Sequence, residues 1–173
     1  MRKLLFPILI ALVFCACHNQ KTEQNKYIIR GITIGTDGEE VLLLDGEKQL
    51  AKTIVKNQSF TFEGVADSVP VWAQIKVDQL NFAQVFLEPG QIVANLGLHR
   101  VTGTPLNDSL DAYSLKLFSI SQSIGDPSVN QDSLKQAFLN LLKVTVAANE
   151  GNVMGQILAK DLAEFETEYL NAN

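Results

Sequence analysis

The spacing of apolar residues changes once along this 173-residue chain, and the change lies near Gly103. Before Gly103, short segments such as 70–77 alternate between apolar and polar residues, which is the two-residue period of a β-strand. After Gly103, apolar residues recur at steps of three and four, which is the period of an α-helix. The sequence therefore predicts an α+β fold, with an N-terminal antiparallel β-sandwich or half-barrel over 27–103 and a C-terminal helical segment of about three helices over 104–173.

Seven or eight short strands are predicted in the first part, each bounded by turn residues. Two hairpins are expected, one around Asn57-Gln58 and one around Pro89-Gly90, where proline fixes φ and glycine takes the positive φ of a type II turn. Short strands at this spacing favour an antiparallel sandwich or a half-closed barrel. The predicted strands are 27–34, 41–44, 52–56, 59–63, 70–77, 82–87, 91–96 and 99–102.

Three helices are predicted in the second part. Thr104 and Pro105 are typical of an N-cap and a first helical position. Breaks at 125–127 and 149–152 separate the first helix from a second and a third, which runs over 153–170. The apolar stripe of the first helix consists of Leu106, Leu110, Tyr113, Leu117, Ile120 and Ile124.

The first 17 residues are predicted to be a targeting segment rather than part of the fold. Arg2 and Lys3 precede an uncharged apolar run that is too short to span a membrane and that ends at Ala16-Cys17. The segment resembles a bacterial lipoprotein signal peptide, which implies cleavage after Ala16 and lipidation of Cys17. Phe14 and Cys15 depart from the usual residues at their positions, and the alternative is an ordinary secretory signal.

A lipid on Cys17 implies a periplasm-facing location in a Gram-negative envelope, because two or more acyl chains anchor a protein stably. Residues 18–26 are polar and are expected to form a flexible tether. Only Glu23 is acidic in this stretch, so the acidic run that sends some lipoproteins to the cell surface is not expected here.

Cysteine usage and charge limit the chemistry of the mature chain. The sequence contains only Cys15 and Cys17, so cleavage and lipidation would leave no free thiol and no disulfide.

Loss of Arg2 and Lys3 lowers the basic count from 14 to 12 against 19 acidic residues, a formal charge of −7. This acidic balance argues against nucleic acid as a partner.

Three residues are candidates for a binding surface. Trp72 faces away from the apolar stripe of its strand, so it either binds a partner or covers a second core. Glu88 is either a recognition group at a loop tip or, as the simpler interpretation, a solvated carboxylate in a turn. His99, beside Arg100, is either an anion-binding group or a structural histidine.

No catalytic, metal or cofactor site is predicted. No second histidine or cysteine accompanies His99 at metal-ligand spacing, and Gly35 and Gly38 mark a turn without the lysine or helix of a phosphate loop. The only other mature histidine, His18, lies in the tether, so no Ser-His-Asp arrangement is expected. We therefore expect a protein that is not an enzyme.

A series of short motifs resembles a known family. The strand part is similar to the domain of unknown function at the N-terminus of Bacteroidetes thioredoxin-like lipoproteins of the alkyl hydroperoxide reductase/thiol-specific antioxidant class. The helical part resembles the linker that precedes the thioredoxin-like domain in those proteins. The matching residues are 29–31, Asp37-Gly38 with 41–44, 57–64, 86–90, and 102–104 with Asn107.

The chain departs from that family where redox chemistry would lie, because it contains no Cys-x-x-Cys pair. The leading hypothesis is a non-catalytic, lipid-anchored periplasmic module that binds a protein or a small ligand. The alternative is the membrane-tethering half of a thiol-disulfide oxidoreductase whose catalytic domain is missing or supplied by another chain, with a periplasmic thioredoxin-like protein as partner. A third hypothesis is a carrier of apolar ligands, which requires a cavity.

Overall fold

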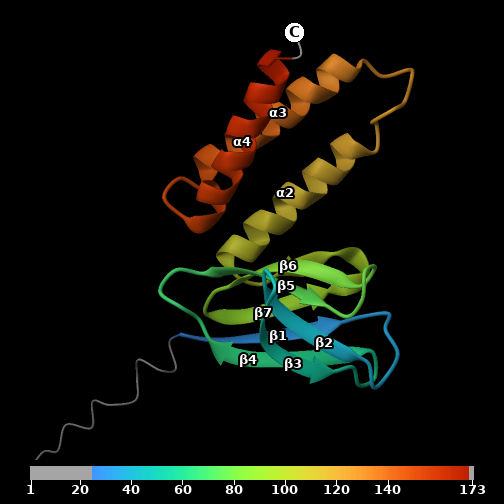
Figure 1. The fold of residues 1–173 in the computed structure, drawn as a ribbon, viewed down its shortest axis with the longest axis vertical. Coiled ribbons are helices and arrows are strands. Elements are labelled where there is room, and N and C mark those ends of the chain that lie inside the picture. Colours follow the sequence, from blue (N-terminus) through green and yellow to red (C-terminus); the bar gives the residue numbers. More distant parts are fainter. Residues whose placement is uncertain (1–24, 172–173) are drawn as a thin grey trace, which may run out of the picture.

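The computed structural model describes residues 25–171, and the side chains through Glu168. The predicted signal peptide, Cys17 and all of the predicted tether except its last two residues lie outside the described residues. Within that range the chain forms strands first and helices second, and the change lies between β8 and α2 (Figure 1). The predicted α+β fold class is confirmed.

Eight strands in residues 25–102 form two four-stranded sheets that pack face to face. One sheet has the order β4-β1-β7-β8 and the other has the order β3-β2-β5-β6. The strands are β1 (Lys26–Ile32), β2 (Glu40–Asp45), β3 (Lys48–Ile54), β4 (Ser59–Val65), β5 (Val71–Lys76), β6 (Phe82–Leu87), β7 (Gly90–Asn95) and β8 (Arg100–Thr102).

The connection at Glu88 and Pro89 joins the two sheets, so the hairpin predicted there is wrong. β6 pairs with β5 in one sheet, whereas β7 pairs with β1 and β8 in the other. The pairing of β1 with β7 is also parallel, unlike the other strand pairs. A local turn pattern cannot distinguish a hairpin from a crossover, because both need the same reversal of the chain.

At Asn57-Gln58 the turn of the predicted hairpin is confirmed, with φ values of 51° and 56°, but the predicted pairing of its two strands is wrong. The carboxylate of Asp37 accepts hydrogen bonds from both turn amides, at 3.0 Å and 3.2 Å. The flanking strands β3 and β4 nevertheless belong to different sheets. Tertiary packing therefore separates β3 from β4 within a few residues of the turn that joins them.

Two glycines on the strands leave room for aromatic rings. A Cβ atom on Gly31 would overlap the ring of Phe60, its partner across β1 and β4, and one on Gly64 would overlap the ring of Tyr27. These rings lie over the glycines on the inner face of the sheet, where Tyr27 and Phe60 are buried. Any larger residue at either glycine would displace a core ring.

The helices pack on the sheet that carries β5 and β6. α2 (Pro105–Ser121) rises from the β6 edge of the sandwich, and α3 (Gln131–Ala148) and α4 (Val153–Asn171) run side by side as a pair (Figure 1). Thr104 is the N-cap of α2 and Pro105 its first residue, as predicted. Among residues 25–171, no helix is both long and apolar enough to cross a bilayer.

Two apolar clusters share this sheet. The larger cluster fills the sandwich, and Val85 of β6 is fully buried in it. The neighbouring Phe86 points to the other face and joins a second cluster with Leu142 of α3 and Met154 of α4. Because residues 25–171 contain both clusters and every described strand pairing, we expect a chain that starts at Asn25 to fold on its own.

Candidate functional site

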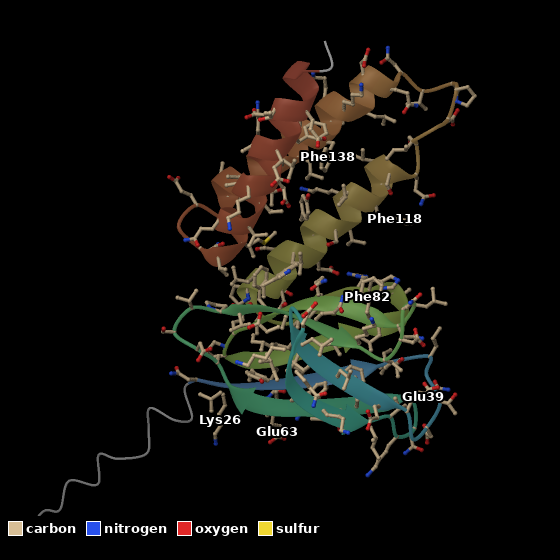
Figure 2. All side chains as sticks on the ribbon, in the orientation of Figure 1. Lys26, Glu39, Glu63, Phe82, Phe118 and Phe138 are labelled. Carbon is tan, nitrogen blue, oxygen red and sulfur yellow. The ribbon has the colours of Figure 1, made fainter. Side chains whose placement is uncertain are left out.

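A cleft of about 400 Å³ lies between the outer face of β5 and β6 and the helices α2 and α4. Figure 2 shows Phe82 on the side of the sandwich that faces the helices. Most of the lining is apolar. The lining residues are Trp72, Phe82, Gln84, Phe86, His99, Val101, Leu110, Asp111, Tyr113, Ser114, Leu117, Met154, Ile157, Leu158 and Asp161.

Trp72 forms part of the cleft wall and part of the second cluster. Its indole packs against the ring of Phe86 with the centroids 4.6 Å apart. The interpretation of Trp72 as cover for a second core is therefore confirmed. Its side chain also lines the cleft, and its role in binding stays a prediction.

His99 lies at the same cleft, but not in a strand as predicted. It follows η1 (Leu96–Leu98) with a φ of 54°, and β8 begins one residue later. Its Nδ1 lies 2.8 Å from the carbonyl oxygen of Phe82, and its ring lies 4.5 Å from the ring of Phe82. Because a carbonyl oxygen only accepts, Nδ1 carries a proton and donates.

Arg100 is held by Asp111 and does not form an anion site with His99. Its Nε donates to Asp111 Oδ1 at 2.8 Å and its Nη2 donates to Oδ2 at 2.6 Å. These bonds and the charge of Asp111 raise the pKa of the Arg100 guanidinium. The pair joins β8 to α2, and Asp111 is buried.

Tyr113 and Asp161 face the cleft from α2 and α4, respectively. Burial raises the pKa of the Tyr113 phenol, and the negative charge of Asp161 raises it further. Asp161 itself has no hydrogen bond or ion pair with any other residue of the described chain. The cleft therefore has one carboxylate, that of Asp161, that is not neutralised by a neighbouring base.

Glu88 lies outside the cleft, and the prediction of a solvated carboxylate is wrong. The side chain is buried, with 8% of its surface exposed. Its Oε1 accepts hydrogen bonds from the backbone N–H groups of Leu106 at 2.8 Å and Asn107 at 3.2 Å. Glu88 therefore caps the N-terminus of α2, where free N–H groups and the helix dipole favour a carboxylate.

Asn107 is the residue that fixes α2 on the edge of the sheet, a role that was not predicted from the sequence. It is fully buried; its Oδ1 accepts from the N–H of Phe86 and its Nδ2 donates to the Phe86 carbonyl, each at 2.9 Å. Nδ2 also donates to Thr104 Oγ1 at 2.8 Å. The Asn107 amide thus takes the place of a neighbouring strand at the edge of β6. In the sequence, the only indication of this role is that Asn107 belongs to the family-like motif formed with residues 102–104.

The helical side of the cleft was also not predicted. Met154, Ile157 and Asp161 come from α4, more than 50 residues after His99 in the chain. Only the packing of α4 beside α2 brings them to the sheet. Among the described residues, no group of three or more histidine, cysteine, aspartate or glutamate side chains is placed to hold a metal ion.

Comparison with known protein families gives a match to the strand part of the chain. Residues 27–110 match the family described as "Domain of unknown function (DUF4369)". No curated protein and no solved structure matches the chain. The matched range contains the sandwich, Glu88 and Asn107, and it ends within α2. Residues 27–110 of this chain are therefore similar to the DUF4369 family, a domain of unknown function.

Proposed function

We propose that this chain is a non-catalytic, lipid-anchored and periplasm-facing module that binds an apolar small ligand in the cleft between the sandwich and the helices. The cleft carries the proposal. Its volume of about 400 Å³ lies within the range of roughly 300–1,000 Å³ that is typical of small-molecule sites. Such sites combine an apolar lining with a few polar groups, and here His99, Ser114 and Asp161 supply those groups.

Binding of a fluorescent probe, with and without a substitution that blocks the cleft, tests this proposal. The chain from Asn25 to Asn173 is titrated with the neutral probe N-phenyl-1-naphthylamine, and Trp72, the single tryptophan, reports binding through quenching of its emission. Ser114→Phe places a ring in the cleft and is expected to weaken binding about fivefold, since one blocked aromatic contact is worth on the order of 1 kcal/mol.

Ser119→Phe is the matched control, because Ser119 is exposed on the same helix and lies outside the cleft lining. It should leave binding unchanged. A wild-type chain that does not bind the probe, or equal binding by the two variants, would contradict the proposal.

The anchor is proposed from the Ala16-Cys17 segment and is tested in cells. Metabolic labelling with a fatty-acid analogue should mark the wild-type chain and the Cys15→Ser variant, whereas Cys17→Ser should lose the label. Label that persists in Cys17→Ser would exclude Cys17 as the lipidated residue.

The second candidate function is the membrane-tethering half of a thiol-disulfide oxidoreductase, with a thioredoxin-like protein as partner. The observation that favours it is a second apolar hollow of about 400 Å³ on the helices, lined by Leu117, Ile120, Ile124, Leu134, Phe138 and Phe165 among others. Ile124, which lines this hollow, is 68% exposed, and Phe118 on the same stretch of chain but outside the hollow (Figure 2) is 62% exposed. A docked domain would cover such a surface.

A pulldown from envelope extract tests this candidate. Recovery of a thioredoxin-like protein by the wild-type chain, and its loss with Ile124→Asp but not with Ser119→Asp, would support tethering. A pulldown without a thioredoxin-like protein would contradict it.

A further inference from the structure

The aromatic content of the cleft is the first observation that bears on its ligand. Trp72, Phe82, Phe86 and Tyr113 bring four aromatic side chains to one cleft, three of them from adjacent strands and one from α2. Indole, phenyl and phenol rings carry negative charge on their faces, so they attract a cation that lies above them. A neutral apolar ligand gains no such attraction.

Charge is the second observation. Within the part of the chain that the structure describes, no lysine or arginine lines the cleft. The guanidinium of Arg100 donates hydrogen bonds to both carboxylate oxygens of Asp111, which is a lining residue. The arginine therefore cannot neutralise Asp161, whose carboxylate lies close enough to Tyr113 to raise the pKa of that phenol.

From these two observations we infer that the cleft is selective for a small organic cation, an apolar body that carries an ammonium group. The ammonium would lie beside Asp161 at the mouth, and the apolar body would lie against Trp72 and Phe86. This inference rests on the proposed function, because it assumes that the cleft is a ligand site. It adds the chemical class of the ligand.

A pair of probes that differ in one atom tests the inference. Phenyltrimethylammonium and tert-butylbenzene have nearly the same shape, but only the first carries a positive charge. Both are titrated into the chain from Asn25 to Asn173, with Trp72 emission and calorimetry as readouts. The cation should bind about tenfold more tightly than the hydrocarbon, which corresponds to a cation–π and ion-pair gain of about 1.4 kcal/mol.

Asp161→Asn keeps the shape of the side chain and removes its charge. It should weaken binding of the ammonium about fivefold, consistent with a partly exposed ion pair, and leave binding of the hydrocarbon unchanged. Glu164→Gln is the matched control, because Glu164 is exposed on the same helix outside the cleft and its loss changes the net charge equally. It should change neither affinity.

The outcomes separate this inference from the proposed function. Preference for the ammonium that is lost in Asp161→Asn alone supports the inference. Binding of both probes with equal affinity, or a preference that Asp161→Asn does not alter, overturns the cation inference and leaves the apolar-ligand site standing. Binding of neither probe overturns the cation inference, and it overturns the proposed function as well if N-phenyl-1-naphthylamine also fails to bind.

Discussion

Single buried polar side chains hold the helices of this protein on its sandwich. Glu88 and Asn107 meet at the start of α2, where backbone N–H groups have no partner within the helix. Each of these side chains binds backbone atoms of an element other than its own. Their contribution to stability is therefore larger than that of exposed polar residues, whose partners water can replace.

Glu88→Ala is expected to lower the free energy of unfolding by about 2 kcal/mol, because the N–H groups of Leu106 and Asn107 would be left buried and unpaired. Glu88→Gln keeps one acceptor oxygen and should cost about 1 kcal/mol. Urea unfolding measures both. Glu63→Ala, at an exposed position on β4, is the control, and equal stability of Glu63→Ala and Glu88→Ala would show that the cap contributes little.

Asp37 makes the stability of the turn at Asn57-Gln58 depend on pH. Hydrogen bonds from the two turn amides hold the pKa of Asp37 below the usual 3.8. A lowered pKa in the folded state gives stability that is present above the unfolded pKa and is lost as the pH falls through the folded pKa.

Asp37→Ala should therefore destabilise the protein at neutral pH, and the difference from wild type should shrink as the pH falls below about 3.8. Urea midpoints of the two chains across this range test the prediction. A difference that does not change with pH would mean that the carboxylate charge has no part in the effect.

At the scale of the element, α2 acts as the partner of an edge strand. β6 is the last strand of its sheet, and its Phe86 N–H and carbonyl point away from β5. Edge groups of this kind can pair with other chains unless they are covered. The Asn107 amide covers them and fixes the first turn of α2 on the sheet.

Asn107→Leu should cost about 2–4 kcal/mol, because it leaves the Phe86 N–H and carbonyl buried without partners. Asn140→Leu, at an exposed position on α3, should change stability by less than about 0.5 kcal/mol. Chemical unfolding gives both values, and hydrogen exchange should show faster exchange of the Phe86 amide in Asn107→Leu alone. Unchanged exchange at Phe86 would contradict this role for Asn107.

At the scale of the whole molecule, one sheet serves two cores. Residues of β6 alternate between the sandwich cluster, which contains Val85, and the helical cluster, which contains Phe86. Loosening either cluster exposes the shared strand, so we expect the two parts to unfold together.

Leu142→Ala in the helical cluster should lower the free energy of unfolding by about 2–4 kcal/mol, and Ile29→Val in the sandwich by about 1 kcal/mol. In both variants the Trp72 fluorescence and the far-ultraviolet circular dichroism should change at the same urea concentration. If Leu142→Ala separated the two transitions, the helices and the sandwich would be independent units.

The fold class, the order of strands and helices and the start of α2 at Thr104-Pro105 followed from the sequence by itself. These features depend on residues close together in the chain, through the period of the apolar side chains and the fixed φ of proline. The signal-like segment that ends at Cys17 is equally local, and the proposal of a lipid anchor rests on the sequence alone.

Only the tertiary structure decided which strands pair, what Glu88 does and where the cleft lies. The turns at Asn57-Gln58 and Pro89-Gly90 indicate a reversal of the chain, but the packing of two sheets around one core places the strands on either side of each turn in different sheets. Glu88 meets the α2 N-terminus 18 residues later in the chain, and Asp161 reaches the cleft from α4. Contacts between residues so far apart leave no periodic signal, because they depend on how whole elements pack rather than on local spacing.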